Sequence, residues 1–137
     1  MKSWILCALG TVGGAISAAF GGWSEGLTTL VIFMAVDYIT GVIAAGVFHN
    51  SGKSETGRLE SNAGWKGLCK KVAGLFMVLV AVRLDLLVGT EFIKDAVVIG
   101  FICNDGISIL ENAGLMGLEY PEAVKKGFEV LSKKSGK

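Results

Sequence analysis

Five ionisable side chains lie within long apolar runs of the sequence, where a charge needs either a partner or water. They are Asp37, Arg83, Asp85, Asp105 and Glu111. In a lipid bilayer, an exposed aspartate or arginine at mid-depth costs about 2.5–3.5 kcal/mol, so such groups should face protein or water. Charged groups held in that setting can neutralise one another, form an ion relay or line a water-filled lumen.

Polar residues in the last apolar run recur at helical spacing. The positions i, i+1, i+4, i+7 and i+8 form one stripe, which consists of Asn104, Asp105, Ser108, Glu111 and Asn112. The stripe either lines water when several copies assemble or fastens one helix to the next. The whole predicted lumen or interhelix polar surface comprises Asp37, Arg83, Asp85, Asn104, Asp105, Ser108, Glu111 and Asn112.

The sequence shows no constellation suited to catalysis, metal binding or a cofactor. His49 has no second histidine or cysteine at ligand spacing, and neither a nucleophile with its base nor a phosphate-binding glycine loop is present. The three cysteines are scattered, and a net charge of +1 does not indicate nucleic-acid binding. We therefore expect neither an enzyme nor a metal or cofactor site.

The surrounding sequence predicts helices that cross a lipid bilayer. Hydrophobic residues make up 52% of the 137 residues, which is unusual for a soluble domain. A spanning helix needs about 20 apolar residues, and four runs approach that length: 4–20, 27–48, 72–88 and 96–117. We predict a single all-α integral membrane domain over residues 1–137, built as a bundle of four transmembrane helices.

The distribution of charge predicts how this bundle is oriented. Lysine and arginine exceed acidic residues between the second and third runs and in the tail 118–137, as expected for cytoplasmic segments. Four spans with both termini in the cytoplasm satisfy this pattern. The first run also resembles a signal peptide; if it is cleaved or lies on the surface, three spans remain and the amino end faces outwards.

The four-span arrangement brings particular charges to similar depths. Asp37 and Asp105 each fall about ten residues into their spans, which places both near the bilayer midplane. Arg83 lies slightly further out on the third span. The sequence therefore predicts a buried ion pair between Arg83 and one of these aspartates.

Small residues and a basic tail predict two further helix surfaces. A small-residue ridge suits close helix contact, within the chain or with another copy; it comprises Gly10, Gly14, Ala18 and Gly22, with a shorter version at Gly41 and Ala45. After Pro121, the residues Val124, Phe128 and Leu131 fall on one helical face, with lysines on the others. The tail is either a basic amphipathic helix on the inner leaflet or a solvated, partly disordered segment.

Several ordered blocks of the chain resemble the phage holin family that also includes the clostridial toxin-secretion holins. One is DYITG at residues 37–41, and another is the lysine-rich segment 66–71 before the third run. The most specific is SILEN at residues 108–112, with Gly117 and Pro121 after it. Asp105 stands where the family pattern has glutamate, and the glycine-rich first run is specific to this chain.

The resemblance implies a small protein of the bacterial cytoplasmic membrane that associates with itself and permeabilises the bilayer at a set time. Endolysin, or a toxin in some relatives, then passes without needing direct contact with it. We hypothesise that a convertible surface turns from a protein seam towards a lumen; it comprises Asp37, Arg83, Asp105, Ser108, Glu111 and Asn112. The alternatives are an antiholin or membrane scaffold, and a small ion channel or transporter.

Overall fold

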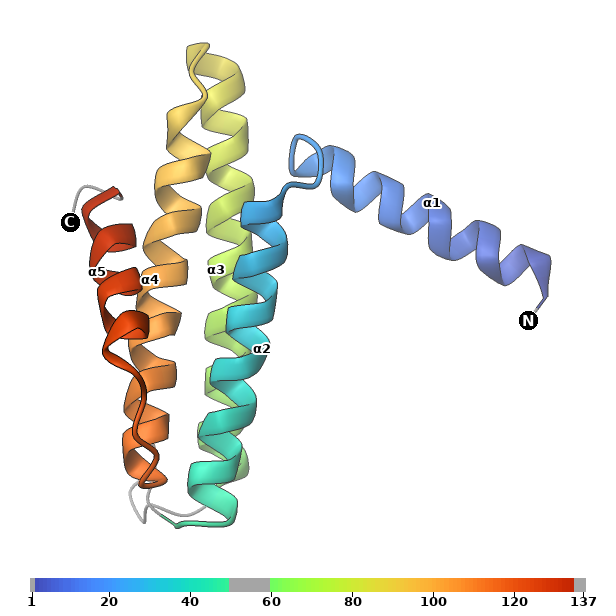
Figure 1. Cartoon of the computed structure of the whole chain (residues 1–137). Helices are drawn as coiled ribbons and strands as arrows, with labels where there is room; N and C mark the ends of the chain where they lie inside the picture. Colours follow the sequence, from blue (N-terminus) through green and yellow to red (C-terminus); the bar gives the residue numbers. More distant parts are fainter. Residues whose placement is uncertain (1, 50–59, 135–137) are drawn as a thin grey trace.

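The computed structural model describes residues 2–49 and 60–134, and these residues form five α-helices. The helices are α1 (Ser3–Ala19), α2 (Glu25–Gly46), α3 (Ser61–Val88), α4 (Phe92–Leu115) and α5 (Glu122–Lys134). The prediction of an all-helical chain is confirmed. Figure 1 shows α2, α3 and α4 side by side along a common axis, with α5 against α4 and α1 pointing away.

The core lies where α2, α3 and α4 meet. Leu27 and Leu30 of α2 and Val78 of α3 have no exposed surface, and Val98 and Ile102 of α4 pack with them. Apolar residues on the outer faces of these helices are instead left exposed, as for Ile32, Phe76 and Leu87, among others. Large exposed apolar surfaces mark contact with lipid or protein partners, so the bundle has an apolar exterior around a partly polar interior.

One described helix is both long and apolar enough to cross a membrane by length and composition. That helix is α2, with 22 residues, whereas α1 is apolar but has only 17. Ionic residues within the 28-residue α3 and the 24-residue α4 lower their apolar character. The structure thus shows an all-helical fold, and a membrane bundle of four helices is not established by it.

The third helix begins well before the predicted apolar run. The sequence predicts a span from Val72, but α3 is already helical from Ser61, so Lys66, Lys70 and Lys71 are helical rather than loop residues. Lysine has a good helix propensity and lies on a helix as readily as in a loop. Hydropathy locates the apolar part of a helix, and this helix continues beyond it.

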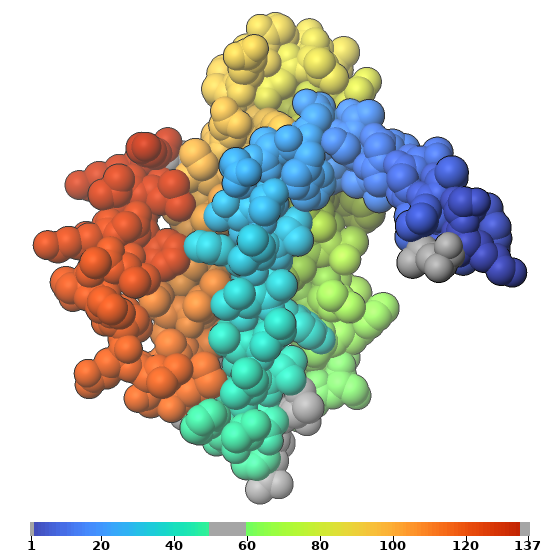
Figure 2. Space-filling model, turned by 45° about the vertical axis from the view of Figure 1, so that its right-hand side comes forward, coloured from blue at the N-terminus to red at the C-terminus, as the bar shows by residue number. Residues whose placement is uncertain are grey.

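Helix α1 stands apart from the bundle. None of its residues is buried, and a side-chain carbon built at Gly10 or Gly14 would meet nothing within 4 Å. Figure 2 shows α1 projecting from one side of the molecule, with α5 on the other. The small-residue ridge of α1 therefore has no partner within the described residues of one chain, whereas Gly41 and buried Ala45 of α2 face the bundle.

The C-terminal segment forms a helix, as one of the two interpretations of the tail predicts, and this helix packs against the bundle. Two of its apolar residues contact the bundle: the rings of Phe128 and Phe33 pack edge to face with centroids 5.8 Å apart, and Leu131 packs against the core. Val124, which the sequence predicts on the same face, is exposed. A side-chain carbon at Gly106 would overlap the Phe128 ring. Only glycine at position 106 lets α5 approach α4 this closely.

Candidate functional site

A buried ionic cluster joins the three central helices. The Lys71 ammonium of α3 donates hydrogen bonds to Asp37 Oδ2 of α2 at 2.6 Å and to Asp105 Oδ1 of α4 at 3.1 Å. The side chains of Asp37 and Asp105 are 4% and 7% exposed, and that of Lys71 is 18% exposed. One cation therefore ties together two carboxylates that the sequence places at similar depths.

An amide from α4 completes the cluster. The Asn112 side-chain nitrogen donates to the Asp37 backbone oxygen and to Asp37 Oδ1, both at 3.1 Å, and to Thr40 Oγ1 at 2.9 Å. Thr40 is itself anchored, because its hydroxyl donates to the Val36 carbonyl one turn earlier. Asn112 is 3% exposed, so its amide hydrogens are satisfied by α2 rather than by water.

This geometry suits helix fastening more than chemistry on a substrate. Removing one partner of a buried ion pair typically costs about 3–5 kcal/mol, because the other charge stays buried without compensation. Within residues 2–49 and 60–134, no three histidine, cysteine, aspartate or glutamate side chains gather as a possible metal site. The cluster is a polar seam in an otherwise apolar bundle.

The cation at this site differs from the predicted one. The sequence predicts that Arg83 pairs with an aspartate, but Arg83 is exposed and Lys71 makes both ion pairs. The positions of the two residues around α3 explain the difference. Lys71 lies on the same inner face as Gly74 and Val78. Arg83 comes directly after buried Val82, about 100° further around the helix, and so points outwards. Lys71 lies one turn before Gly74 on that inner face, which the packing of α3 defines.

The predicted polar stripe of α4 is divided between the interior and the surface. Asp105 and Asn112 are buried, Ser108 is half-buried, and Asn104 and Glu111 are exposed. The structure therefore brings Asp37, Asp105 and Asn112 together, and it leaves Glu111 and Arg83 outside this cluster.

Asp85 is also buried, but its contacts are at the turn between α3 and α4. Its carboxylate accepts hydrogen bonds from the backbone N–H groups of Ile93 at 3.0 Å and Lys94 at 2.8 Å, and from the Thr90 hydroxyl at 2.7 Å. Gly89 ends α3 in the left-handed region, with φ of 82°. Asp85 thus caps the start of the next helix, whose first N–H groups otherwise lack acceptors.

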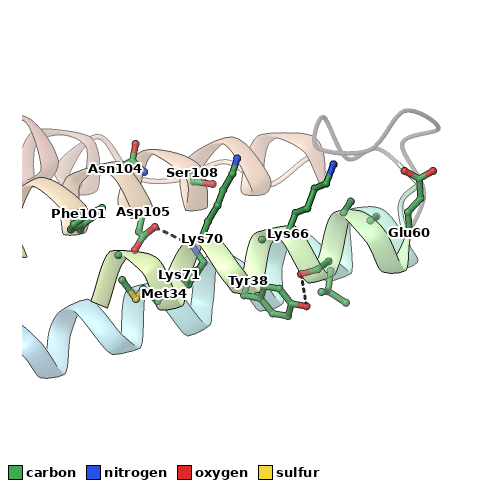
Figure 3. Close-up of a pocket in the computed structure, with 17 residues that line it drawn as sticks. Met34, Tyr38, Glu60, Lys66, Lys70, Lys71, Phe101, Asn104, Asp105 and Ser108 are labelled. Atoms are coloured by element: carbon green, nitrogen blue, oxygen red, sulfur yellow. Dashed lines mark hydrogen bonds and ion pairs between the residues drawn. The ribbon is translucent and has the colours of Figure 1, made fainter. Parts of the chain in front are cut away.

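A groove of about 500 Å³ opens beside the ionic cluster, between α3 and its neighbours α2 and α4. Its formation depends on glycine: Gly64 and Gly67 leave α3 without side chains there, and Tyr38 of α2 lies against both. The Tyr38 hydroxyl donates to the Gly64 carbonyl at 3.2 Å. Figure 3 shows Lys66 and Lys70 extending in the same direction from α3 at this groove.

Comparison with known proteins identifies relatives along nearly the whole chain. The bacteriophage holin family matches residues 14–133. An uncharacterized 14.9 kDa protein in the nagH 3' region of Clostridium perfringens is 37% identical over 96% of this chain and 92% of its own length. An uncharacterized protein of Listeria monocytogenes is 40% identical over 78% of this chain and 71% of its own.

A named phage protein is among the more distant relatives. The probable holin of Bacillus phage phi105 is 28% identical over 77% of this chain and 73% of its own length. No solved structure matches the chain significantly. The family match begins within α1 at residue 14 and covers the bundle, the ionic cluster and α5.

Proposed function

Because this chain belongs to the bacteriophage holin family, we propose that it associates with itself in the bacterial cytoplasmic membrane and opens lesions there. Membrane localisation follows from the family. Endolysin, or a toxin, is the proposed cargo, and it needs no direct contact with the holin. The observation that carries the proposal is the family match over residues 14–133, which includes the polar seam.

The seam suggests how a stable bundle converts into a lesion. In the closed protein, Lys71 forms ion pairs with both Asp37 and Asp105 between α2, α3 and α4. Charged groups inside a membrane protein face either one another or water. We propose that assembly of several copies separates these helices and turns the seam towards a water-filled lumen, with Ser108 and Asn112 beside it and Arg83 and Glu111 joining it from the surface.

The proposed topology places both termini in the cytoplasm. The excess of basic residues between the second and third apolar runs and in the tail 118–137 favours that side. Two residues of the first group, Lys53 and Arg58, lie outside the described residues. If α1 lies along the surface instead of crossing, three spans remain and the amino end faces outwards. Accessibility of a thiol to a membrane-impermeant maleimide distinguishes these arrangements, with Cys7 near the amino end as the natural probe and a Cys69→Ser, Cys103→Ser background to isolate it.

Inducible expression in bacteria tests the function directly. The protein is expressed alone and with a cytoplasmic endolysin that lacks an export signal, while membrane potential and culture turbidity are followed together. We expect abrupt depolarisation in both cultures and lysis only when endolysin is present. Stable potential and growth, with membrane insertion confirmed, would contradict the proposal and favour an antiholin or scaffold; ion-selective conductance without lysis would favour a channel.

A further inference from the structure

We propose that the groove beside the ionic cluster binds one anionic phospholipid, with its phosphate at Lys66 and Lys70 and an acyl chain along the groove. The proposal rests on the membrane location of the family, but not on lesion formation. The volume of the groove, about 500 Å³, falls in the range of small-molecule sites.

Two cations at the groove lack a partner within the described residues. Lys71 is engaged by Asp37 and Asp105, whereas Lys66 and Lys70 are exposed and form no ion pair there. They lie four residues apart on α3, so their side chains occupy the same face, as Figure 3 shows. Two adjacent ammonium groups provide a site for a phosphate.

The acidic residues that line the groove do not cancel this charge. Asp105 is bound to Lys71, and Glu60 precedes the first residue of α3, more than one helical turn before Lys66. Basic pockets between membrane helices on the cytoplasmic side bind anionic headgroups. Lys66 and Lys70 have that character and belong to the end of α3 that the charge pattern assigns to the cytoplasm.

The rest of the lining favours a lipid over a free phosphate. Apolar side chains line much of the groove, among them Met34 and Val42 of α2 and Phe101 of α4, while Asn104 and Ser108 of α4 add polar groups on one side. From Lys66 to Gly74 the helix rises by about 12 Å, so a largely apolar groove leads from the ammonium groups towards the middle of the bundle. An inorganic ion would use only the basic end, whereas a phospholipid matches both ends.

Lipid retention by the purified full chain tests the assignment. Native mass spectrometry in a non-ionic detergent would compare bound dioleoyl phosphatidylglycerol with dioleoyl phosphatidylcholine. For the double variant K66Q/K70Q, we expect affinity for phosphatidylglycerol to fall by about 10- to 30-fold, given the typical attraction of each lysine to an anionic headgroup. The matched control is K125Q/K126Q, which removes the same charge from exposed positions of α5, and it should retain the lipid.

A second variant tests the acyl-chain part of the groove. A side-chain carbon at Gly67 would meet Tyr38 at 3.7 Å, an ordinary contact, so Gly67→Leu should fold and fill the groove. Gly114→Leu is its control, because nothing lies within 4 Å of that position. We expect Gly67→Leu to weaken phosphatidylglycerol binding at least about fivefold and Gly114→Leu to leave it unchanged.

Three results would overturn the assignment: equal retention of the two lipids, equal losses in K66Q/K70Q and K125Q/K126Q, or displacement of the lipid by millimolar inorganic phosphate. The last would identify an anion site with no lipid function. Binding is measured here without any lysis, so a protein that binds the lipid but fails to depolarise cells contradicts the proposed function and leaves this inference intact.

Discussion

Lys71 is the residue on which the buried cluster depends, because one ammonium serves two carboxylates on different helices. Replacing Lys71 by methionine keeps much of its apolar length but leaves Asp37 and Asp105 facing each other. We expect a loss of about 3–5 kcal/mol in unfolding free energy, measured by titration of the detergent-solubilised protein with a denaturing detergent. Lys70→Met, at the exposed neighbouring position, should change stability by less than about 0.5 kcal/mol; equal losses would contradict this role of Lys71.

Asn112 must be an amide rather than a carboxylate, since it donates to Asp37 and Thr40. Asn112→Ala should cost about 1–3 kcal/mol through lost hydrogen bonds. Asn112→Asp should cost more, because it adds a negative charge beside Asp37. Thermal unfolding of the two variants would measure the difference, with Asn104→Asp on the exposed face as the control. A smaller loss for Asn112→Asp than for Asn112→Ala would refute this account.

The sequence predicted the acidic and amide members of this cluster but not Lys71, the cation at its centre. Charges inside apolar runs drew attention to Asp37 and Asp105, and helical spacing to Asn112, because such residues are costly in a membrane unless they are satisfied. Lys71 was missed because it lies at the edge of an apolar run, where lysines ordinarily reach the membrane surface. Only packing shows that its ammonium turns inwards to the aspartates.

At the scale of elements, α5 and α4 fit together through one glycine. Because a side-chain carbon at Gly106 would overlap Phe128, Gly106→Leu should displace α5. We expect trypsin cleavage at the α5 lysines to accelerate about tenfold or more, since 1.4 kcal/mol of lost docking energy is a factor of ten. Gly114→Leu on the same helix has open space and should leave the cleavage rate unchanged. An equal rate for both variants would show that α5 is not held by this contact.

Helix α5 cannot stay docked on the bundle where its outer face would contact lipid. Lysines 125, 126, 133 and 134 are exposed on α5, and Phe128 holds the helix beside Gly106, near the middle of α4. A lysine exposed to lipid at mid-bilayer costs about 2.5–3.5 kcal/mol. We therefore expect α5 to lie docked only where its outer face meets water or another copy, and otherwise at the membrane surface.

The turn between α3 and α4 depends on the carboxylate of Asp85. Asp85→Ala should destabilise the protein by about 1–2 kcal/mol, as expected for the loss of a helix-capping side chain. Hydrogen exchange at the Ile93 and Lys94 amides would detect it, because both lose their acceptor. Asp95→Ala, at an exposed position in the first turn of α4, is the control; equally fast exchange in both variants would contradict the capping role.

For the whole molecule, composition predicted a helical chain with an apolar exterior, and the lengths of the apolar runs predicted the approximate bounds of α2 and α4. The arrangement of α1 could not be predicted, because a small-residue ridge shows that a helix can pack closely without showing its partner. The ridge has none within the described part of the chain, as Gly10 and Gly14 show.

This exposed ridge leads to a prediction about assembly. Gly10→Leu together with Gly14→Leu should leave the stability of the isolated chain within about 0.5 kcal/mol, because no neighbour is crowded. If α1 packs against another copy, the same variant should reduce chemical cross-linking between copies in membranes. Gly127→Leu, on the exposed part of α5, is the control. Undiminished cross-linking in the double glycine variant would show that the ridge contacts lipid rather than another copy.

The Asp85 cap has a consequence for biogenesis. A loop that crosses a bilayer must bring its polar backbone groups with it, and each unsatisfied group costs several kcal/mol. At this turn, the Asp85 carboxylate accepts hydrogen bonds from the N–H groups of Ile93 and Lys94 in the first turn of α4. The N–H groups of Gly89 and Thr90 donate to the Asp85 carbonyl. In the proposed membrane topology, the two helices can therefore insert as one preformed hairpin.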